Sequence, residues 1–333
     1  MIQRVTKKEN ILFKMIETKL DGLSLLAVEH PSGVALKVFP ELGARLHELT
    51  FVKDNQPIEM LMPLPLNEDP IENPHFFHSP LIPFPNRLRD GAFEHEGTSY
   101  KFPINSPSDH TSLHGMVFNK SFQVIDVECG AEEASCMLQY NYDGADSSYP
   151  WPFTVQIIYT INSSNEILCK TTIQNTGLKS QPMGMGWHHY LSFPQGMADI
   201  ELKLPSSSRV LVGGSMIPTG KKVAETGYDD FKTLDNTKFD TCFKLDHWED
   251  ENTIQVLDRV RELQITVLLN GKKSGFKYFQ LFNHPQGTGF AIEPMTCNID
   301  ALNNGEGMVL LYAGEILDTC FQIKMNDLGD STS

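Results

Sequence analysis

The stretch FTVQIIYTINSSNEILCKTTIQ, residues 153–174, decides the fold class of this chain. Residues 153–161 and 166–174 are runs rich in β-branched and apolar residues, and an apolar side chain recurs at every second position of the first run. Such alternation is typical of half-buried strands, and the Ser and Asn residues between the two runs suit a tight turn. The stretch therefore predicts an antiparallel hairpin.

Comparable runs recur along most of the chain, bounded by Gly, Asn, Asp, Ser or Pro, and no long helical pattern competes with them. They lie at residues 23–28, 34–38, 100–102, 122–127, 136–142, 200–204, 253–257, 263–269, 278–282, 289–292 and 308–312. The Pro-rich segments 57–74 and 80–85 predict loops over a sheet, because proline cannot donate to a central ladder. We therefore expect an all-β fold built as an antiparallel meander.

The domain organisation follows from length and uniformity. The chain has 333 residues, enough to bury a large core, and its sequence shows no internal repeat, low-complexity tract or break in composition. We expect a single domain over residues 1–333, with about residues 1–15 and 327–333 peripheral.

Charge and hydropathy exclude several classes of protein. The net charge is −15, with 42 acidic against 27 basic side chains, which opposes nucleic-acid binding because that requires a basic surface. No apolar run is long enough to cross a membrane, and Lys14 interrupts the short apolar segment 11–13 that a secretory signal would need. We expect a soluble, cytoplasmic protein. Its six cysteines form no Cys-x-x-Cys pair and are expected to be free thiols.

Five short polar segments indicate a site. Each places a hydrogen-bonding or titratable side chain beside aromatic, Pro or Gly residues, which is how a rigid β scaffold presents a small polar pocket. They are Pro85-Asn86-Arg87, Leu113-His114-Gly115, Trp187-His188-His189-Tyr190, Phe239-Asp240-Thr241-Cys242-Phe243 and Ile292-Glu293-Pro294. Together they suggest a sugar pocket that contains an acid and a base.

Two of these segments offer proton-transfer groups. An imidazole titrates near neutrality, and since neighbouring side chains of a strand point to opposite faces, only one of His188 and His189 can enter a given pocket. Glu293 ends an apolar strand before Pro294, and a carboxyl group there either faces solvent or lies in a cleft whose burial raises its pKa toward that of a general base.

Each remaining segment also has an ordinary structural interpretation. Arg87 could present its guanidinium to hydroxyls or pair with Asp90 or Glu94 at the surface. His114 could be turned inward by Gly115 or serve the loop alone, and Asp240 could accept from a sugar hydroxyl or from a turn. The His75-Phe76-Phe77-His78 spacing lacks a third ligand at a matching interval, so we expect no metal site.

The order of the segments resembles that of the aldose 1-epimerase (mutarotase) family. The resemblance runs from about Gly43 to near the C-terminus and lies in the succession of motifs rather than in any one of them. These are Asn86-Arg87, an Arg-Asp-Gly-x-Phe hairpin at 89–93, Leu113-His114-Gly115, Pro-x-Gly-x-Gly-x-His-x-Tyr at 182–190, Phe239-Asp240-x-x-Phe243, and Glu293-Pro294-x-Thr296 followed by Asn303.

That resemblance implies a large antiparallel β-supersandwich of the galactose mutarotase type, with a sugar cleft and neither metal nor organic cofactor. The family places its acid two residues before a Tyr, here Tyr190, which assigns the general acid to His188 and the general base to Glu293. Asn86, Arg87, His114 and Asp240 match substrate-binding positions, with His114 hydrogen-bonding the ring oxygen or neighbouring hydroxyls. The partner implied is a small sugar.

The chemistry explains these residue types independently of the family. Interconverting the anomers of a free aldose requires removing a proton from the C1 hydroxyl while giving one to the ring oxygen, so that the ring opens and recloses on the other face. A carboxylate and an imidazolium on opposite sides of the anomeric centre can perform both transfers.

Departures from the family pattern concern the substrate. His189 stands where the family usually has Pro, Ser or Thr, and Leu191 where Phe is common. Residues 116–120 lack the Arg found in the branch that resembles hexose-6-phosphate epimerases, so a neutral aldose is favoured over a sugar phosphate. A hexose-6-phosphate 1-epimerase and a non-catalytic carbohydrate-binding protein remain the alternatives. The particular sugar, the oligomeric state and the roles of His78, His110 and His189 leave no mark in the sequence.

Overall fold

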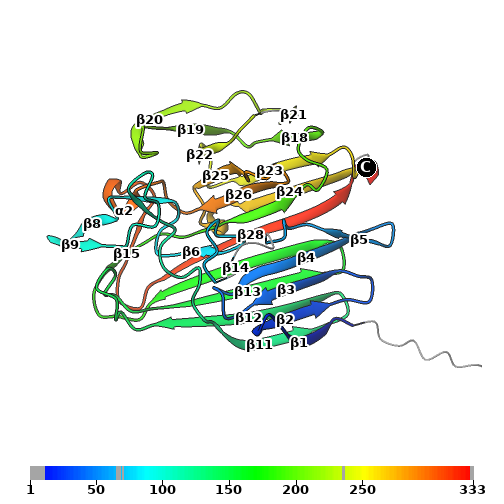
Figure 1. Cartoon of the computed structure of the whole chain (residues 1–333), viewed down its shortest axis with the longest axis horizontal. Helices are drawn as coiled ribbons and strands as arrows, with labels where there is room; N and C mark the ends of the chain where they lie inside the picture. Colours follow the sequence, from blue (N-terminus) through cyan, green and yellow to red (C-terminus); the bar gives the residue numbers. More distant parts are fainter. Residues whose placement is uncertain (1–11, 65–68, 70, 235–236, 331–333) are drawn as a thin grey trace, which may run out of the picture.

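The computed structural model describes residues 12–64, 69, 71–234 and 237–330, and its architecture is almost entirely antiparallel β (Figure 1). The largest sheet has nine strands. Their order is β11 (Gln123–Cys129), β12 (Glu133–Tyr142), β13 (Phe153–Asn162), β14 (Glu166–Asn175), β28 (Ile316–Asp327), β24 (Leu263–Asn270), β23 (Glu251–Asp258), β18 (Ile200–Lys203) and β21 (Lys232–Thr233).

Two further sheets complete the framework. The first has five strands in chain order: β1 (Lys14–Leu20), β2 (Leu23–Glu29), β3 (Ala35–Phe39), β4 (Arg45–Lys53) and β5 (Gln56–Glu59). The second has the order β20 (Pro218–Ala224), β19 (Ser207–Val212), β22 (Asp240–Leu245), β25 (Tyr278–Asn283), β26 (Gly289–Met295), β16 (Gly186–Trp187) and β6 (Pro80–Leu81), with β17 (His189–Ser192) also on β26.

Smaller elements lie around these sheets. Three pairs of short strands are β7 (Arg87–Arg89) with β10 (Thr111–Leu113), β8 (Ala92–His95) with β9 (Thr98–Lys101), and β15 (Gln181–Met183) with β27 (Val309–Leu311). The helices α1 (Gly271–Ser274) and α2 (Ala301–Asn304) have four residues each, and a 3-10 turn covers Leu328–Asp330. No helix of the described residues is long and apolar enough to cross a membrane.

The hairpin predicted from residues 153–174 is confirmed. Strands β13 and β14 pair with Phe153 opposite Asn175 and Ile161 opposite Ile167, and side chains along β13 alternate between buried and half-buried. The all-β expectation is confirmed with it. Strand β28 was outside the expected runs, although its buried residues Thr319, Phe321, Ile323 and Met325 also recur with period two.

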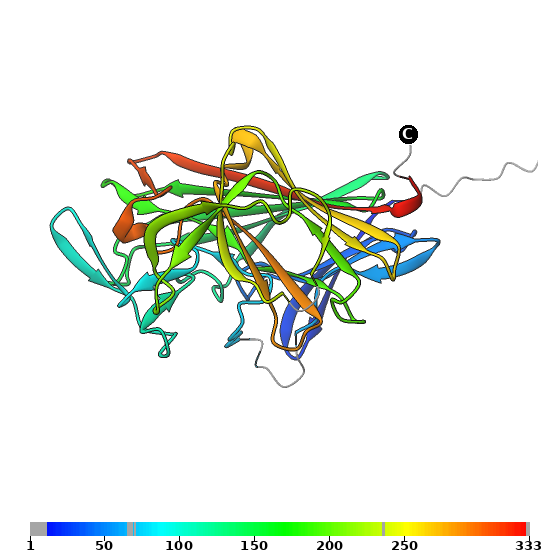
Figure 2. The ribbon, with the colours of Figure 1, turned by 90° about the horizontal axis from the view of Figure 1, so that it is seen from above.

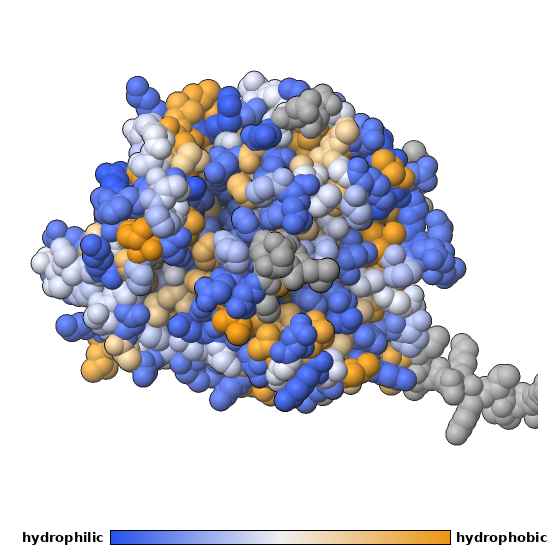
Figure 3. All heavy atoms as spheres, viewed as in Figure 1, coloured by the Kyte–Doolittle hydropathy of each residue, from blue (hydrophilic) through white to orange (hydrophobic). Residues whose placement is uncertain are grey.

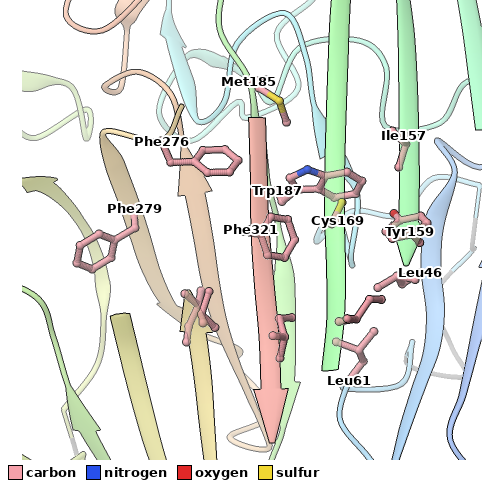
Figure 4. Packing of buried hydrophobic residues seen from close by; sticks show 14 of the residues in the cluster. Leu46, Leu61, Ile157, Tyr159, Cys169, Met185, Trp187, Phe276, Phe279 and Phe321 are labelled. Atoms are coloured by element: carbon pink, nitrogen blue, oxygen red, sulfur yellow. The ribbon is translucent and has the colours of Figure 1, made fainter. Parts of the chain in front are cut away.

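The core lies between the nine-stranded sheet and the other two (Figure 2). Trp187 of β16 is fully buried, and its ring centroid lies 6.0 Å from that of Tyr159 in β13 and 6.2 Å from that of Phe321 in β28 (Figure 4). The Tyr159 hydroxyl donates to the carbonyl of Ala44 at 2.9 Å, which ties β13 to the segment before β4. Outside, hydrophilic and hydrophobic residues are interspersed (Figure 3).

The register of the eight-stranded sheet brings distant polar residues together. In β25 and β26 Gln280 lies opposite Glu293, while β17 and β26 place His189 opposite Ile292, so that His188 comes beside Glu293. Because side chains alternate along a strand, Trp187 and His189 face the apolar core while His188 and Tyr190 face the other side. A polar site is thus formed on one face of a sheet whose other face is core.

Candidate active site

One cavity collects the polar residues singled out in the sequence. Its volume is about 130 Å³ and its walls include Asn86, Arg87, His114, His188, Asp240 and Glu293, all six of the predicted site residues. A larger hollow of about 520 Å³ lies elsewhere, beside β1, β2 and β11, and no histidine lines it among the described residues. Size alone therefore does not identify the site, whereas the convergence of titratable side chains does.

The centre of the cavity is a contact between His188 and Glu293. Nε2 of His188 lies 3.3 Å from Oε1 of Glu293, and both side chains are almost completely buried. We expected the two groups on opposite sides of a sugar's anomeric carbon, but the structure places them in direct contact. Since both reacting oxygens of a hemiacetal are bonded to the same carbon, an acid and a base this close can still reach one oxygen each.

Burial controls the protonation of this pair. It lowers the pKa of His188 to about 3 and raises the pKa of Glu293 well above its usual range, with the nearby carboxylate of Asp240 adding to the second shift and Arg87 opposing it. Both changes favour a pair that is neutral overall. Such a pair holds one transferable proton, carried either by the carboxyl group or by the imidazole. The second oxygen of Glu293, Oε2, has no hydrogen-bond partner among the described residues.

His114 has a defined tautomer. The backbone N–H of Asn86 donates to Nδ1 of His114 at 3.1 Å, so this nitrogen must be an acceptor and the ring proton lies on Nε2. Burial lowers the pKa of His114 well below its ordinary value, and His188 and Arg87 add to the shift. His114 is therefore a neutral donor at the cavity wall.

A hydrogen-bonded chain forms another wall. Nε2 of Gln280 donates to Oδ1 of Asp240 at 2.6 Å, and Nδ2 of Asn86 donates to Oε1 of Gln280 at 3.3 Å. The guanidinium of Arg87 lies 3.8 Å from Asp240 Oδ2, and its Nε donates to Asp109 Oδ2 at 3.0 Å. The wall offers donors and acceptors suited to sugar hydroxyls.

The geometry can be tested against a metal ion. One atom each of His114, His188 and Glu293 lie within 4.8 Å of one another, a separation short enough for three ligands of one cation. A metal ligand nitrogen must offer a lone pair, however, and in the neutral tautomer of His114 the nitrogen left free by Asn86 carries the proton. The donor set is therefore better suited to hydrogen-bonding a substrate than to holding a cation.

The sequence did not single out three residues of the cavity lining, Gln280, Phe76 and Phe282, or Asp109, which bonds to Arg87 from outside the lining. Gln280 has a visible signal, a polar residue at an alternate position of an otherwise apolar strand. The Phe76 ring packs against His114 at a tilt of 54° with a centroid distance of 4.5 Å, and Phe282 lines the cavity. Their aromatic side chains could equally belong to a core, so the sequence did not separate them from core residues.

The three histidines without an assigned role lie outside the cavity lining. His78 donates from Nε2 to the Met62 carbonyl at 2.9 Å and is a structural residue. His189 is stacked on Trp187 in the core at 5.1 Å, and neither of its ring nitrogens has a partner among the described residues. His110 is exposed and pairs with Asp90.

Comparison with known proteins identifies the family. The sequence model described as aldose 1-epimerase matches residues 24–324, and the chain therefore belongs to the aldose 1-epimerase family. It is 27% identical over 282 residues to the uncharacterized protein YihR of Escherichia coli K12, covering 82% of this chain and 85% of that protein.

Solved structures share the fold. A galactose mutarotase-like protein of Clostridium acetobutylicum has a TM-score of 0.81 at 18% identity, covering 95% of this chain and 99% of that one. The galactose 1-epimerase of Lactobacillus acidophilus has a TM-score of 0.77 at 15% identity, with the same coverage of 95% and 99%. The expectation of a galactose mutarotase type of antiparallel β fold is confirmed.

Proposed function

We propose that this chain is an aldose 1-epimerase, a mutarotase that interconverts the α and β anomers of a free aldose. The observation that carries the proposal is the 3.3 Å contact between Nε2 of His188 and Oε1 of Glu293 inside a buried cavity. Membership of the aldose 1-epimerase family supports it.

The reaction uses this pair for two proton transfers. In its reactive form the pair has Nε2 of His188 protonated and Glu293 ionised. The Glu293 carboxylate takes the proton of the C1 hydroxyl while His188 gives its proton to the ring oxygen, and the bond between C1 and the ring oxygen breaks to leave an open-chain aldehyde. Rotation about the C1–C2 bond presents the other face of the aldehyde, and the reversed transfers close the ring.

The pair gains and loses one proton in each half of this cycle. After ring opening Glu293 is protonated and His188 is neutral, which is the form that burial favours in the pKa shifts of both groups. Ring closure restores the starting form, so no proton has to come from solvent. Each positioned acid or base typically accelerates such a step by about 10²–10⁴-fold. The hemiacetal and the open-chain aldehyde are at the same oxidation level, so the reaction needs no redox cofactor.

The remaining side chains orient the sugar. His114 offers a donor, Asp240 and Gln280 offer hydroxyl partners, and Arg87 is the only Lys or Arg among the described residues of the lining. Its charge faces two carboxylates, those of Asp109 and Asp240. This balance favours a neutral aldose over a sugar phosphate, because a phosphate needs cationic partners that are not already paired.

Polarimetry tests the proposal. Freshly dissolved α anomers of glucose, galactose, xylose and arabinose should relax to their equilibrium rotation faster with the protein than without it, and Glu293→Gln and His188→Asn should abolish most of the acceleration. His110→Asn, an exposed histidine outside the cavity, is the matched control. Acceleration with a sugar phosphate alone would indicate the hexose-6-phosphate branch, and sugar binding without acceleration would indicate a binding protein.

A further inference from the structure

Asp109 contacts the site from outside the cavity. Its Oδ2 accepts a hydrogen bond from Nε of Arg87 at 3.0 Å, and the two side chains are only 20% and 13% exposed. Ser106 donates to the same oxygen at 3.2 Å and Ser108 donates to Oδ1 at 3.4 Å. Asp109 does not belong to the cavity lining, so its contact with a substrate would be indirect, through Arg87.

The guanidinium of Arg87 is held on several sides at once. Nη1 donates to Asn86 Oδ1 at 3.3 Å, Nη2 lies 3.8 Å from Asp240 Oδ2, and Nε donates to Asp109. The backbone of Arg87 pairs with Leu113 in the β7–β10 ladder, which joins the cation and the loop that carries Asp109 in one unit. Arg87 therefore lies between one carboxylate that lines the cavity and one that does not.

We propose that Asp109 is a positioning residue for the reaction, which fixes the guanidinium fork of Arg87 toward the sugar and offsets its positive charge. The inference rests on the proposed function, since it assigns Arg87 to the same sugar. The bond from Nε to Asp109 leaves the two Nη groups directed at Asn86 and Asp240, where they can donate to sugar hydroxyls. Without it the long side chain would have more rotational freedom to lose on binding.

The charge on Asp109 has a second consequence, for Glu293. The groups that face this carboxyl group are Arg87 from β7, Asp240 and Cys242 from β22, His188 between β16 and β17, and His114 after β10. Arg87 lowers the pKa of Glu293, whereas burial and Asp240 raise it. A carboxylate that offsets Arg87 therefore keeps the Glu293 pKa high, and its removal should lower that pKa.

Two substitutions separate geometry from charge. Asp109→Asn keeps an oxygen that can accept from Arg87 Nε but removes the charge, while Asp109→Ala removes both. We expect Asp109→Ala to raise KM about tenfold or more, the size of one lost charge-assisted hydrogen bond, with a smaller change in kcat. We expect Asp109→Asn to change KM less than Asp109→Ala does and to move the alkaline limb of the kcat/KM profile to lower pH, because the pair then loses its shared proton more easily.

Asp90→Asn is the matched control. Asp90 is an exposed carboxylate one hairpin turn from Arg87 and it pairs with His110 instead. This variant should leave KM and the pH profile unchanged, and thermal melts should show that all three variants are folded.

A role limited to holding the 105–110 loop predicts different results. The proposal is overturned if Asp109→Ala has the parent KM, or if the alkaline limb of the Asp109→Asn profile does not move. Calorimetric titration with 1,5-anhydroglucitol, a glucose analogue that lacks the C1 hydroxyl, gives an independent readout. If the parent binds this analogue but does not accelerate the mutarotation of any aldose, the proposed function fails. Asp109→Ala then still tests the positioning role, because it should weaken binding of the analogue about tenfold.

Discussion

The backbone amide of Asn86 donates to Nδ1 of His114 at 3.1 Å, and this bond places the proton of His114 on Nε2. The two residues lie close together because the β7–β10 ladder sets Arg87, which follows Asn86, opposite Leu113, which precedes His114. A histidine that is a neutral donor differs in function from His188, whose Nε2 faces an ionisable group. The roles of the two histidines can be separated experimentally.

His114→Asn should lower kcat/KM without changing its pH dependence. The Asn oxygen can still accept from the Asn86 amide, but the donor at Nε2 is lost, and one hydrogen bond to the substrate is worth about 0.5–1.5 kcal/mol. Because His114 stays neutral, its removal deletes no titration of its own. Steady-state polarimetry from pH 5 to pH 9 checks this, and a profile that changes shape would contradict the assigned tautomer.

Glu293→Gln and His188→Asn should each lower kcat/KM by about 10²–10⁴-fold. The double variant should be little worse than either single one, since groups that act as a unit are not additive. In the parent, kcat/KM should fall on the alkaline side as the pair loses its shared proton, at a pH above the usual carboxyl range because burial raises the pKa of Glu293. Two independent, additive losses would show that the residues do not share a proton.

Gln280→Leu should raise KM about tenfold with a smaller change in kcat. The substitution removes the donor to Asp240 at 2.6 Å and the acceptor for Asn86, which frees both neighbours to turn away from the sugar. Gln156→Leu is the control, because the Gln156 amide bonds to Gln139 in the nine-stranded sheet, away from the cavity lining. Equal KM values for the two variants would show that Gln280 does not contribute to substrate binding.

His189→Phe should stabilise the protein by about 1–3 kcal/mol, because it replaces two buried nitrogens without partners by apolar atoms and keeps the stacking on Trp187. His78→Phe should destabilise it, since His78 donates to the Met62 carbonyl and accepts from the Tyr190 amide at 3.4 Å. Urea unfolding at pH 7 distinguishes the two, and equal effects would contradict this account.

The same two histidines predict acid lability. Burial lowers the pKa of His78 to about 3 and that of His189 well below its usual value, so the unfolded chain takes up these protons first as the pH falls below about 6.5. The contribution of these two groups to the free energy of unfolding is therefore fully present above that pH and is lost as the pH falls toward 3. His189→Phe should flatten this decline in melting temperature, and a parallel decline would show that His189 contributes nothing to it.

Gly115→Ala should damage both stability and activity. Gly115 has a φ of +70°, and a Cβ there would lie 2.1 Å from the Ile82 carbonyl oxygen, which is backbone and cannot turn aside. A shift of this loop would move His114 with it, since the two residues are adjacent. Gly97→Ala, also at positive φ but with open space around it, is the control for backbone strain alone. Melting temperatures and polarimetry should separate the two variants.

The amino-acid sequence by itself determined the fold class and predicted which groups transfer protons. Alternation in residues 153–161 predicts a half-buried strand whatever surrounds it, because a strand's two faces are set by its own backbone geometry. The order of the motifs predicted roles for His188 and Glu293. Because neighbouring side chains of a strand point to opposite faces, the sequence also predicted that only one of His188 and His189 enters the cavity, and the cavity lining contains His188 alone of the two.

The tertiary structure alone decided how these groups meet. The 3.3 Å contact of His188 with Glu293 depends on β17 and β26 pairing in one register, and a slip of one residue would turn Glu293 into the core. Gln280 lies on β25 and Asp109 on the loop before β10. Their hydrogen bonds to Asp240 and to Arg87 join segments distant in the sequence, so no local sequence pattern predicts them. The tertiary structure also decided the protonation of His188 and Glu293, because the pKa of a carboxyl or imidazole group depends on how far folding removes it from water.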